Sequence, residues 1–189
     1  HAQKLAKEQG KIYVSPYNDP QIIAGQGTLA IELLDQLPRL DVVYVSIGGG
    51  GLISGIGSVL KAFSPKTRVV GVSAKNSAEL AASIRAGKMV KVDHHETLAD
   101  GCAGGVDSDT ITLGLGTEVI DDLIDCSEKQ IVSGLQQIAW SEKMLVEGSA
   151  GLAYAAWQED ARKNNNKISA VVLCGANFDK ETLSPIVNL

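Results

Sequence analysis

The chain has 189 residues, of which 44% are hydrophobic and 21% charged, and its formal net charge is −5. This length and composition suit one globular domain, or most of one, with a sizeable core. The acidic balance argues against a nucleic-acid footprint, which needs clustered Lys and Arg. No apolar run reaches the roughly 18 residues of a membrane span, so we expect neither a nucleic-acid nor a membrane partner.

The three cysteines, Cys102, Cys126 and Cys174, stand far apart without a Cys-x-x-Cys pair. That pattern favours free thiols in a reducing cytoplasm over a disulfide framework. The chain opens with a polar, helix-like segment instead of an apolar signal sequence, so a cytoplasmic location is expected. The missing initial Met suggests a fragment or a processed chain.

Helices and short apolar strands alternate along the chain, with one long polar loop at residues 92–111 and a polar turn at 163–167. In chain order the periodicity predicts a helix at residues 1–9, a strand at 11–14, a helix at 28–37, a strand at 42–47, a helix at 52–63, a strand at 68–72, helices at 77–86, 112–123, 127–145 and 149–162, and a strand at 168–173. The helix at 28–37 is expected to be capped through Thr28, and the helix after Ser127 through Ser127.

This alternation indicates an α/β fold, a parallel sheet flanked by helices. In such sheets ligands bind beyond the carboxyl ends of the strands. Two motifs lie at such ends: Gly48-Gly49-Gly50-Gly51-Leu52 follows the strand at 42–47, and Cys174-Gly175-Ala176-Asn177 follows the strand at 168–173.

Four consecutive glycines after a buried strand indicate a turn that binds an anion. Glycine lets the backbone adopt positive φ and approach a ligand closely. Successive amide groups and the positive end of the following helix then attract a phosphate. The run is neither a dinucleotide fingerprint, because Ser54 stands where the third glycine belongs, nor a P-loop, because Ile56 follows Gly55 where a P-loop has lysine.

Other candidate residues leave several roles open. Cys174 could hydrogen-bond a ring nitrogen of a cofactor, act as a nucleophile or simply pack, and most free cysteines pack. Glu147 could complement a helix dipole or face a cofactor ring. His94 and His95 could be metal ligands, but no second ligand cluster accompanies them, which favours a solvated loop pair.

Six segments together resemble one family. They occur in the order found in threonine/serine dehydratases and serine racemases, enzymes of fold type II (tryptophan synthase β-like) that use pyridoxal 5′-phosphate (PLP). The segments are Asp19-Pro20, Ala24-Gly25-Gln26-Gly27-Thr28, Gly48-Gly49-Gly50-Gly51-Leu52, Ala99-Asp100-Gly101, Glu147-Gly148-Ser149-Ala150-Gly151 and Cys174-Gly175-Ala176-Asn177.

The resemblance implies cofactor-binding roles for the matched positions. Gly48, Gly49, Gly50, Gly51 and the amide of Leu52 would hold the cofactor phosphate. Cys174 would face the pyridine nitrogen as a neutral group, which makes the ring a weaker electron sink and suits elimination of water. Gly101 and Glu147 would lie near the ring.

The chain also departs from the family pattern. No lysine of this chain is matched to the one that holds the cofactor as a Schiff base in the family's Ser-x-Lys-x-Arg-like segment, so no catalytic residue is assigned in this chain. The family places that lysine in an N-terminal part that would precede His1. The whole chain, residues 1–189, is therefore expected to be the C-terminal part of such an enzyme, mostly its large cofactor-binding domain and inactive alone.

The comparison with the family also argues against a site for a divalent cation in this chain. Serine racemase-like members offer one acid where this chain has Ser73 and a second acid six positions on, which Glu79 matches. Ser73 cannot supply the first carboxylate, and Mg²⁺ and Ca²⁺ need several oxygen ligands. No metal site is assigned.

The expected function is that of a PLP-dependent dehydratase, which eliminates water from a hydroxy amino acid to give a 2-oxo acid and ammonia. A serine racemase, or a dehydratase of a hydroxyaspartate or hydroxyectoine pathway, shares every motif. A PLP-binding fragment or a complementing half without activity alone is the non-enzyme alternative. Expected partners are an amino-acid substrate, the missing N-terminal part and further copies of the chain in a homo-oligomer.

Overall fold

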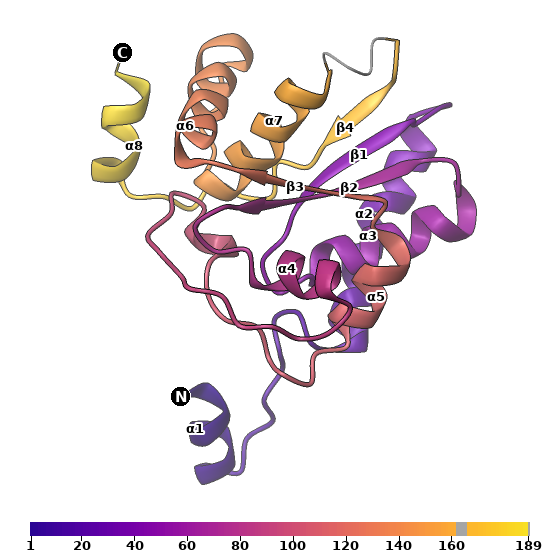
Figure 1. The fold of residues 1–189 in the computed structure, drawn as a ribbon, viewed down its shortest axis with the longest axis vertical. Helices are drawn as coiled ribbons and strands as arrows, with labels where there is room; N and C mark the ends of the chain where they lie inside the picture. Colours follow the sequence, from indigo (N-terminus) through magenta and orange to yellow (C-terminus); the bar gives the residue numbers. More distant parts are fainter. Residues whose placement is uncertain (162–165, 189) are drawn as a thin grey trace.

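The computed structural model describes residues 1–161 and 166–188. Within these residues a parallel sheet of order β3-β2-β1-β4 lies between two layers of helices (Figure 1). The strands are β1 (Val42–Ser46), β2 (Arg68–Ala74), β3 (Asp122–Cys126) and β4 (Ser169–Val171). The helices are α1 (Ala2–Glu8), α2 (Pro20–Gln36), α3 (Gly51–Phe63), α4 (Glu79–Ala86), α5 (Thr112–Val119), α6 (Glu128–Gln137), α7 (Gly148–Ala161) and α8 (Lys180–Val187). The predicted α/β fold with a parallel sheet flanked by helices is confirmed.

Strand β1 is the centre of the core. All five of its residues are buried, as expected for a parallel strand covered on both faces. Val42 and Tyr44 pack on one face of the sheet with α6 and α7. Val43 and Val45 pack on the other face with α2 and α3. The alternation of side chains along the strand thus joins both layers.

Parallel pairing brings the carboxyl ends of the strands to one edge of the sheet. Ser46 of β1 pairs with Val72 of β2, and Tyr44 of β1 pairs with Val171 of β4. The glycines at 48–51 follow β1 directly, and Cys174 comes three residues after β4 ends. Both motifs therefore leave the sheet at the same edge.

Helix α2 begins earlier than predicted. It starts at Pro20, and Asp19 is its N-cap, with Oδ1 accepting hydrogen bonds from the amides of Gln21 (2.8 Å) and Ile22 (3.2 Å). Thr28 lies inside the helix and donates to the carbonyl of Gly25. The predicted cap at Thr28 is wrong because Asp followed by Pro already forms a complete helix start.

Three further sequence predictions need correction. Residues 11–14 form no strand and are exposed. The helix predicted at 112–123 ends at Val119, and the chain then enters β3. The helix predicted at 127–145 is α6, capped at Ser127, followed by a π-helical turn at Ile138–Glu142.

Smaller differences lie near the C-terminus. Helix α8 was not predicted. The polar turn at 163–167 and the end of the predicted helix at Arg162 fall largely outside the described residues.

The outer parts of the chain are less enclosed. Helix α1 buries none of its residues and stands apart from the sheet in Figure 1.

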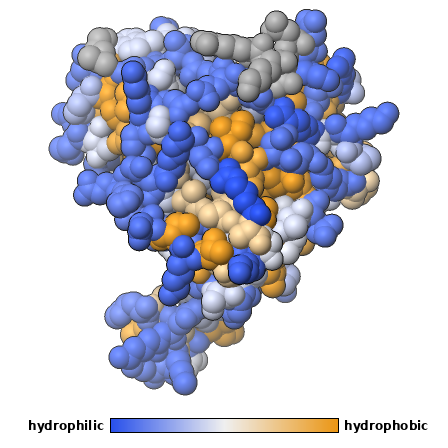
Figure 2. All heavy atoms as spheres, in the orientation of Figure 1, coloured by the Kyte–Doolittle hydropathy of each residue, from blue (hydrophilic) through white to orange (hydrophobic). Residues whose placement is uncertain are grey.

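Figure 2 shows an apolar area (orange) in the middle of one face, where Figure 1 draws the strands. Among the described residues, no helix is both long and apolar enough to cross a membrane.

Candidate functional site

The glycines at positions 48–51, here called the glycine turn, connect β1 to α3. Gly50 has φ of 86°, a left-handed conformation, and α3 begins at Gly51. A Cβ added at Gly48 would lie 3.0 Å from the Cα of Cys102, and one at Gly51 would lie 2.8 Å from the Cα of Tyr17. The close backbone approaches and the positive φ together require glycine here.

The ring of Tyr17 forms one wall of the glycine turn. A Cβ added at Gly49 would lie 2.3 Å from Cγ of Tyr17, so the ring occupies the space of a side chain. The Tyr17 hydroxyl accepts a hydrogen bond of 2.9 Å from the amide of Asp107. Tyr17 thereby joins the glycine turn to the long polar loop.

Two threonines hold the turn from the side of α5. The Thr112 hydroxyl donates to the carbonyl of Gly49 at 2.7 Å. Oγ1 of Thr110 lies 2.7 Å from Oγ1 of Thr112. Both threonines are buried. Because the Gly49 carbonyl is engaged by Thr112, that peptide group is fixed, and the turn can present amides without rearranging.

The start of α3 can attract an anion. The first amides of a helix have no partner within the helix, and they carry the positive end of its dipole. Helix α3 is 13 residues long and has no acidic side chain in its first turn. This arrangement is typical of phosphate sites.

A second group of predicted residues meets beside the turn. Glu147 accepts a hydrogen bond from the amide of Asn177 at 2.9 Å, and its own amide donates to the carbonyl of Gly175 at 3.1 Å. A Cβ at Gly175 would lie 2.6 Å from Cδ of Glu147, and one at Gly101 would lie 3.4 Å from its Oε1. Glu147 thus bridges the segments that carry Gly101 and Cys174.

The Cys174 thiol is held neutral. The residue is exposed as a whole, yet the protein atoms around its sulfur raise its pKa to about 12, and Cys102 and Glu147 act in the same direction. Burial likewise raises the pKa of Cys102. A neutral thiol is a weak nucleophile but can still form hydrogen bonds.

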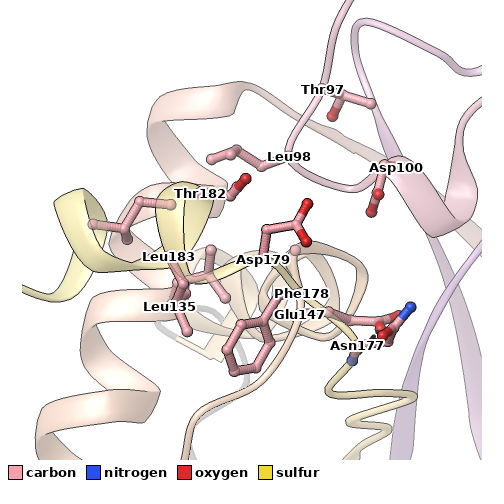
Figure 3. Close-up of a pocket in the computed structure, with 12 residues that line it drawn as sticks. Thr97, Leu98, Asp100, Leu135, Glu147, Asn177, Phe178, Asp179, Thr182 and Leu183 are labelled. Carbon is pink, nitrogen blue, oxygen red and sulfur yellow. Dashed lines mark hydrogen bonds between the residues drawn. The ribbon is translucent and has the colours of Figure 1, made fainter.

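Between the Glu147 group and α8 lies a cavity of about 250 Å³ (Figure 3). Asp100, Glu147, Asn177 and Asp179 contribute polar groups to its wall. Its apolar wall includes Leu135 and Leu183. The cavity therefore adjoins Glu147 and Asn177, whereas the glycine turn does not line it.

The structure therefore brings the predicted residues into one region. Gly48 approaches Cys102, the neighbour of Gly101, and Ser46 donates to the carbonyl of Ser149 at 2.6 Å. The sequence indicates Asn177 only as the last residue of the motif after β4, without a role of its own. Nothing in the sequence indicates that Tyr17 and Thr112 reach the turn.

His94 lies in the polar loop and is exposed, as predicted for a solvated loop pair, but its ring also has two partners. Its Nε2 lies 3.0 Å from Oε2 of Glu79, and its Nδ1 lies 2.8 Å from Oγ of Ser77. Within the described residues, no group of three or more His, Cys, Asp or Glu side chains is arranged to hold a metal ion.

A parallel α/β sheet with a glycine turn between β1 and α3 at its carboxyl edge agrees with the family that the sequence comparison identifies. The family model described as "Pyridoxal-phosphate dependent enzyme" matches residues 1–175. The chain therefore belongs to the pyridoxal-phosphate-dependent enzyme family.

Similar proteins include threonine-processing enzymes and a racemase. The chain is 34% identical to the L-threonine ammonia-lyase of Thermotoga maritima over 187 residues, which are 99% of this chain and 46% of that protein. It superposes on the processed threonine deaminase isoform 2 of Solanum lycopersicum with a TM-score of 0.91 and 29% identity, covering 100% of this chain and 55% of the other. Maize serine racemase gives a TM-score of 0.87 at 30% identity, with coverage of 97% and 56%. The chain spans about half the length of the relatives it matches.

The residues present fit the phosphate and the ring of PLP. The glycine turn is closely packed by Tyr17, Cys102 and Leu80, and it ends on helical amides suited to a phosphate. The neutral thiol of Cys174 can meet a ring nitrogen, and Gly101 offers a surface without a side chain. What the motifs lack is the lysine that would bind the cofactor covalently.

Proposed function

We propose that this chain binds PLP and is the C-terminal part of a threonine/serine dehydratase-like lyase. In this proposal Gly48, Gly49, Gly50, Gly51 and the amide of Leu52 hold the phosphate. The single observation that carries the proposal is the glycine turn, in which Tyr17, Cys102 and Leu80 leave no room for a side chain. The similarity to threonine ammonia-lyases and deaminases supports this assignment.

Cys174 would face the pyridine nitrogen as a neutral hydrogen-bonding partner. Its raised pKa supports this role, because a thiolate or a carboxylate would instead favour a protonated ring. Glu147 would fix the position of Cys174 through its bonds to Gly175 and Asn177, while Gly101 would leave room beside the ring. When bound, PLP supplies an electron sink that stabilises negative charge at the substrate Cα.

The chain alone is proposed to be inactive. The segment Ser64-Pro65-Lys66-Thr67-Arg68 matches Ser-x-Lys-x-Arg, but it leads into β2 at the sheet edge opposite the glycine turn, and Lys66 is exposed, so this lysine is not suited to hold the cofactor. The relatives have about as much additional chain again. Proton removal from the substrate would depend on that missing lysine. Residues 1–189 would then be mostly the large cofactor-binding domain, working with an N-terminal part in the cytoplasm as a homo-oligomer.

A second candidate is racemisation of a hydroxy amino acid. The similarity to maize serine racemase favours it, since every motif named above is shared. Dehydratases of hydroxyaspartate or hydroxyectoine pathways would share those motifs as well. A PLP-binding fragment without turnover is the non-enzyme alternative.

Reconstitution tests the proposal. The chain is co-expressed with the N-terminal half of the Thermotoga maritima L-threonine ammonia-lyase, and 2-oxo acid is measured with L-threonine and L-serine. We expect PLP-dependent 2-oxo acid from the pair and none from either part alone. A folded, PLP-loaded pair that racemises serine without forming 2-oxo acid would favour the second candidate, and one with neither activity would contradict the lyase proposal.

A further inference from the structure

A polar cluster outside the glycine turn joins helix α4 to the long loop between α4 and α5. It consists of Ser77, Glu79 and His94, with the amides of Gly104 and Val106. This loop also carries Gly101 and reaches Tyr17 through Asp107. The cluster thus anchors the segment from which several residues of the candidate site come.

The hydrogen bonds of the cluster form a continuous series. The Gly104 amide donates to Oγ of Ser77 at 2.9 Å, and the Ser77 hydroxyl can donate to Nδ1 of His94 at 2.8 Å. His94 Nε2–H then donates to Oε2 of Glu79 at 3.0 Å. The Val106 amide donates to Oε1 of Glu79, also at 3.0 Å. Both carboxylate oxygens of Glu79 therefore have donors.

A buried carboxylate needs such partners. Glu79 is 8% exposed. Burial acts to raise the pKa of Glu79, but the hydrogen bonds from Val106 and His94 outweigh it, and the pKa is lowered. Glu79 is thus a carboxylate at neutral pH, and the chain itself supplies hydrogen-bond donors to both of its oxygens.

A divalent cation does not fit beside Glu79. The position that a second carboxylate would occupy holds Ser73, whose hydroxyl is buried and has no hydrogen-bond partner among the described residues. The imidazole of His94 occupies one side of the Glu79 carboxylate and a backbone amide the other. Mg²⁺ and Ca²⁺ need several oxygen ligands. Beside Glu79, N–H groups of His94 and Val106 take the positions where such a cation and its other ligands would lie.

We propose that His94 takes the place of a divalent cation at Glu79, so that the α4–α5 loop is held on the start of α4 by the chain's own groups and needs no metal. His94 acts as a positioning residue, because it fixes the loop that carries Gly101 without touching the candidate cofactor position. The proposal does not depend on PLP binding, since its readouts are measured on the chain without cofactor.

The first test uses the unaltered chain. After treatment with EDTA, its thermal unfolding midpoint is measured alone and with added CaCl₂, MgCl₂ or MnCl₂. We expect the same midpoint in every case. A midpoint that falls on removal of metal, or rises with one of these cations, would overturn the proposal.

The second test compares His94→Ala with His95→Ala, a matched change at the exposed neighbouring histidine. Amide hydrogen exchange at Gly104 and Val106 should become roughly tenfold faster or more in His94→Ala and stay unchanged in His95→Ala. His94→Gln should restore slow exchange, because a glutamine amide can also donate to Glu79. Equal exchange in His94→Ala and the unaltered chain, or a glutamine variant as fast as alanine, would contradict the role of His94.

Discussion

At the scale of single residues, the glycine turn depends on the exclusion of side chains. Gly49 and Gly51 face Tyr17, Gly48 faces Cys102, and Gly50 has positive φ. Three constraints are close contacts and the fourth is a backbone conformation, and each acts on a different position, which explains why one glycine would not suffice. Substitutions in the turn should therefore act on ligand affinity and on packing together.

We predict that Gly49→Ala weakens PLP binding at least roughly tenfold and destabilises the fold by about 1–3 kcal/mol, the range for overpacked sites. The reason is the 2.3 Å approach of the new Cβ to the Tyr17 ring. Fluorescence titration with PLP and urea unfolding measure the two effects.

Gly25→Ala is the matched control for Gly49→Ala. A Cβ at this position within α2 meets nothing within 4 Å. It should leave PLP binding unchanged and raise stability by about 0.5–1 kcal/mol, because alanine is the better helix former. Equal effects of the two substitutions would contradict the role of the turn.

Tyr17 combines a ring contact with a hydroxyl contact, and two variants separate them. Tyr17→Phe removes only the acceptor for the Asp107 amide and should cost about 0.5–1.5 kcal/mol. Tyr17→Ala also removes the wall of the turn and should cost roughly 2 kcal/mol or more, less than a fully buried aromatic. Urea unfolding measures the loss of unfolding free energy in both variants. Equal losses in Tyr17→Phe and Tyr17→Ala would contradict this account.

The raised pKa of Cys174 predicts a specific pH dependence of its alkylation. The thiolate is the reactive form, so a higher pKa lowers the rate at neutral pH. With a pKa of about 12, the rate with iodoacetamide should still rise roughly tenfold per pH unit between about pH 8 and pH 11. Peptide mass spectrometry follows the site, and the urea-unfolded chain is the control. A rate that levels off near pH 9 in the folded chain would show an ordinary thiol.

At the scale of elements, helix starts position the site. Helix α2 lies against α3, and its first turn follows Tyr17 and is fixed by Asp19. Helix α3 starts at the glycine turn itself. The geometry of the turn thus depends on where both helices begin.

We predict that Asp19→Ala lowers the free energy of unfolding by about 0.5–2 kcal/mol, because the amides of Gln21 and Ile22 lose their acceptor. Asp35→Ala, an exposed acid in the last turn of the same helix, is the control and should be neutral or slightly stabilising. Chemical denaturation measures both. Equal losses at the two ends of α2 would contradict the capping role.

Several elements could be predicted from the sequence because their signals are local. The buried strand at Val42–Ser46, the glycine turn and the capping at Ser127 all follow from neighbouring residues. The start of α2 at Asp19-Pro20 is equally local, although Thr28 offers a second, competing cap signal. The strand-end motifs also correctly placed the glycine turn and Cys174 at the same edge of the sheet.

The remaining features depend on long-range packing. Strand β3 has Asp122 and Asp125 among its five residues, so its pattern resembles a helix end until it pairs with β2. Residues 11–14 have β-branched side chains but find no strand partner. The contacts of Tyr17 with the glycine turn and of His94 with Glu79 join residues far apart in sequence, so no local pattern predicts them.

At the scale of the whole molecule, the sheet ends in two open edges, β3 and β4. Strand β4 is short and only half-buried, although parallel sheets are usually covered. A shallow cavity beside it is lined by Tyr154, Trp157 and Val171. These features agree with the proposal that further chain completes the enzyme.

The central claim is that the glycine turn of this chain binds the phosphate of PLP, although the chain lacks the lysine that would bind the cofactor covalently. Native mass spectrometry of the chain with PLP, before and after borohydride treatment, tests both halves of it. We expect a one-to-one complex that inorganic phosphate displaces and that denaturation releases completely, even after borohydride. Failure to bind PLP, or a reduced covalent adduct on one specific lysine of the chain, would contradict the account.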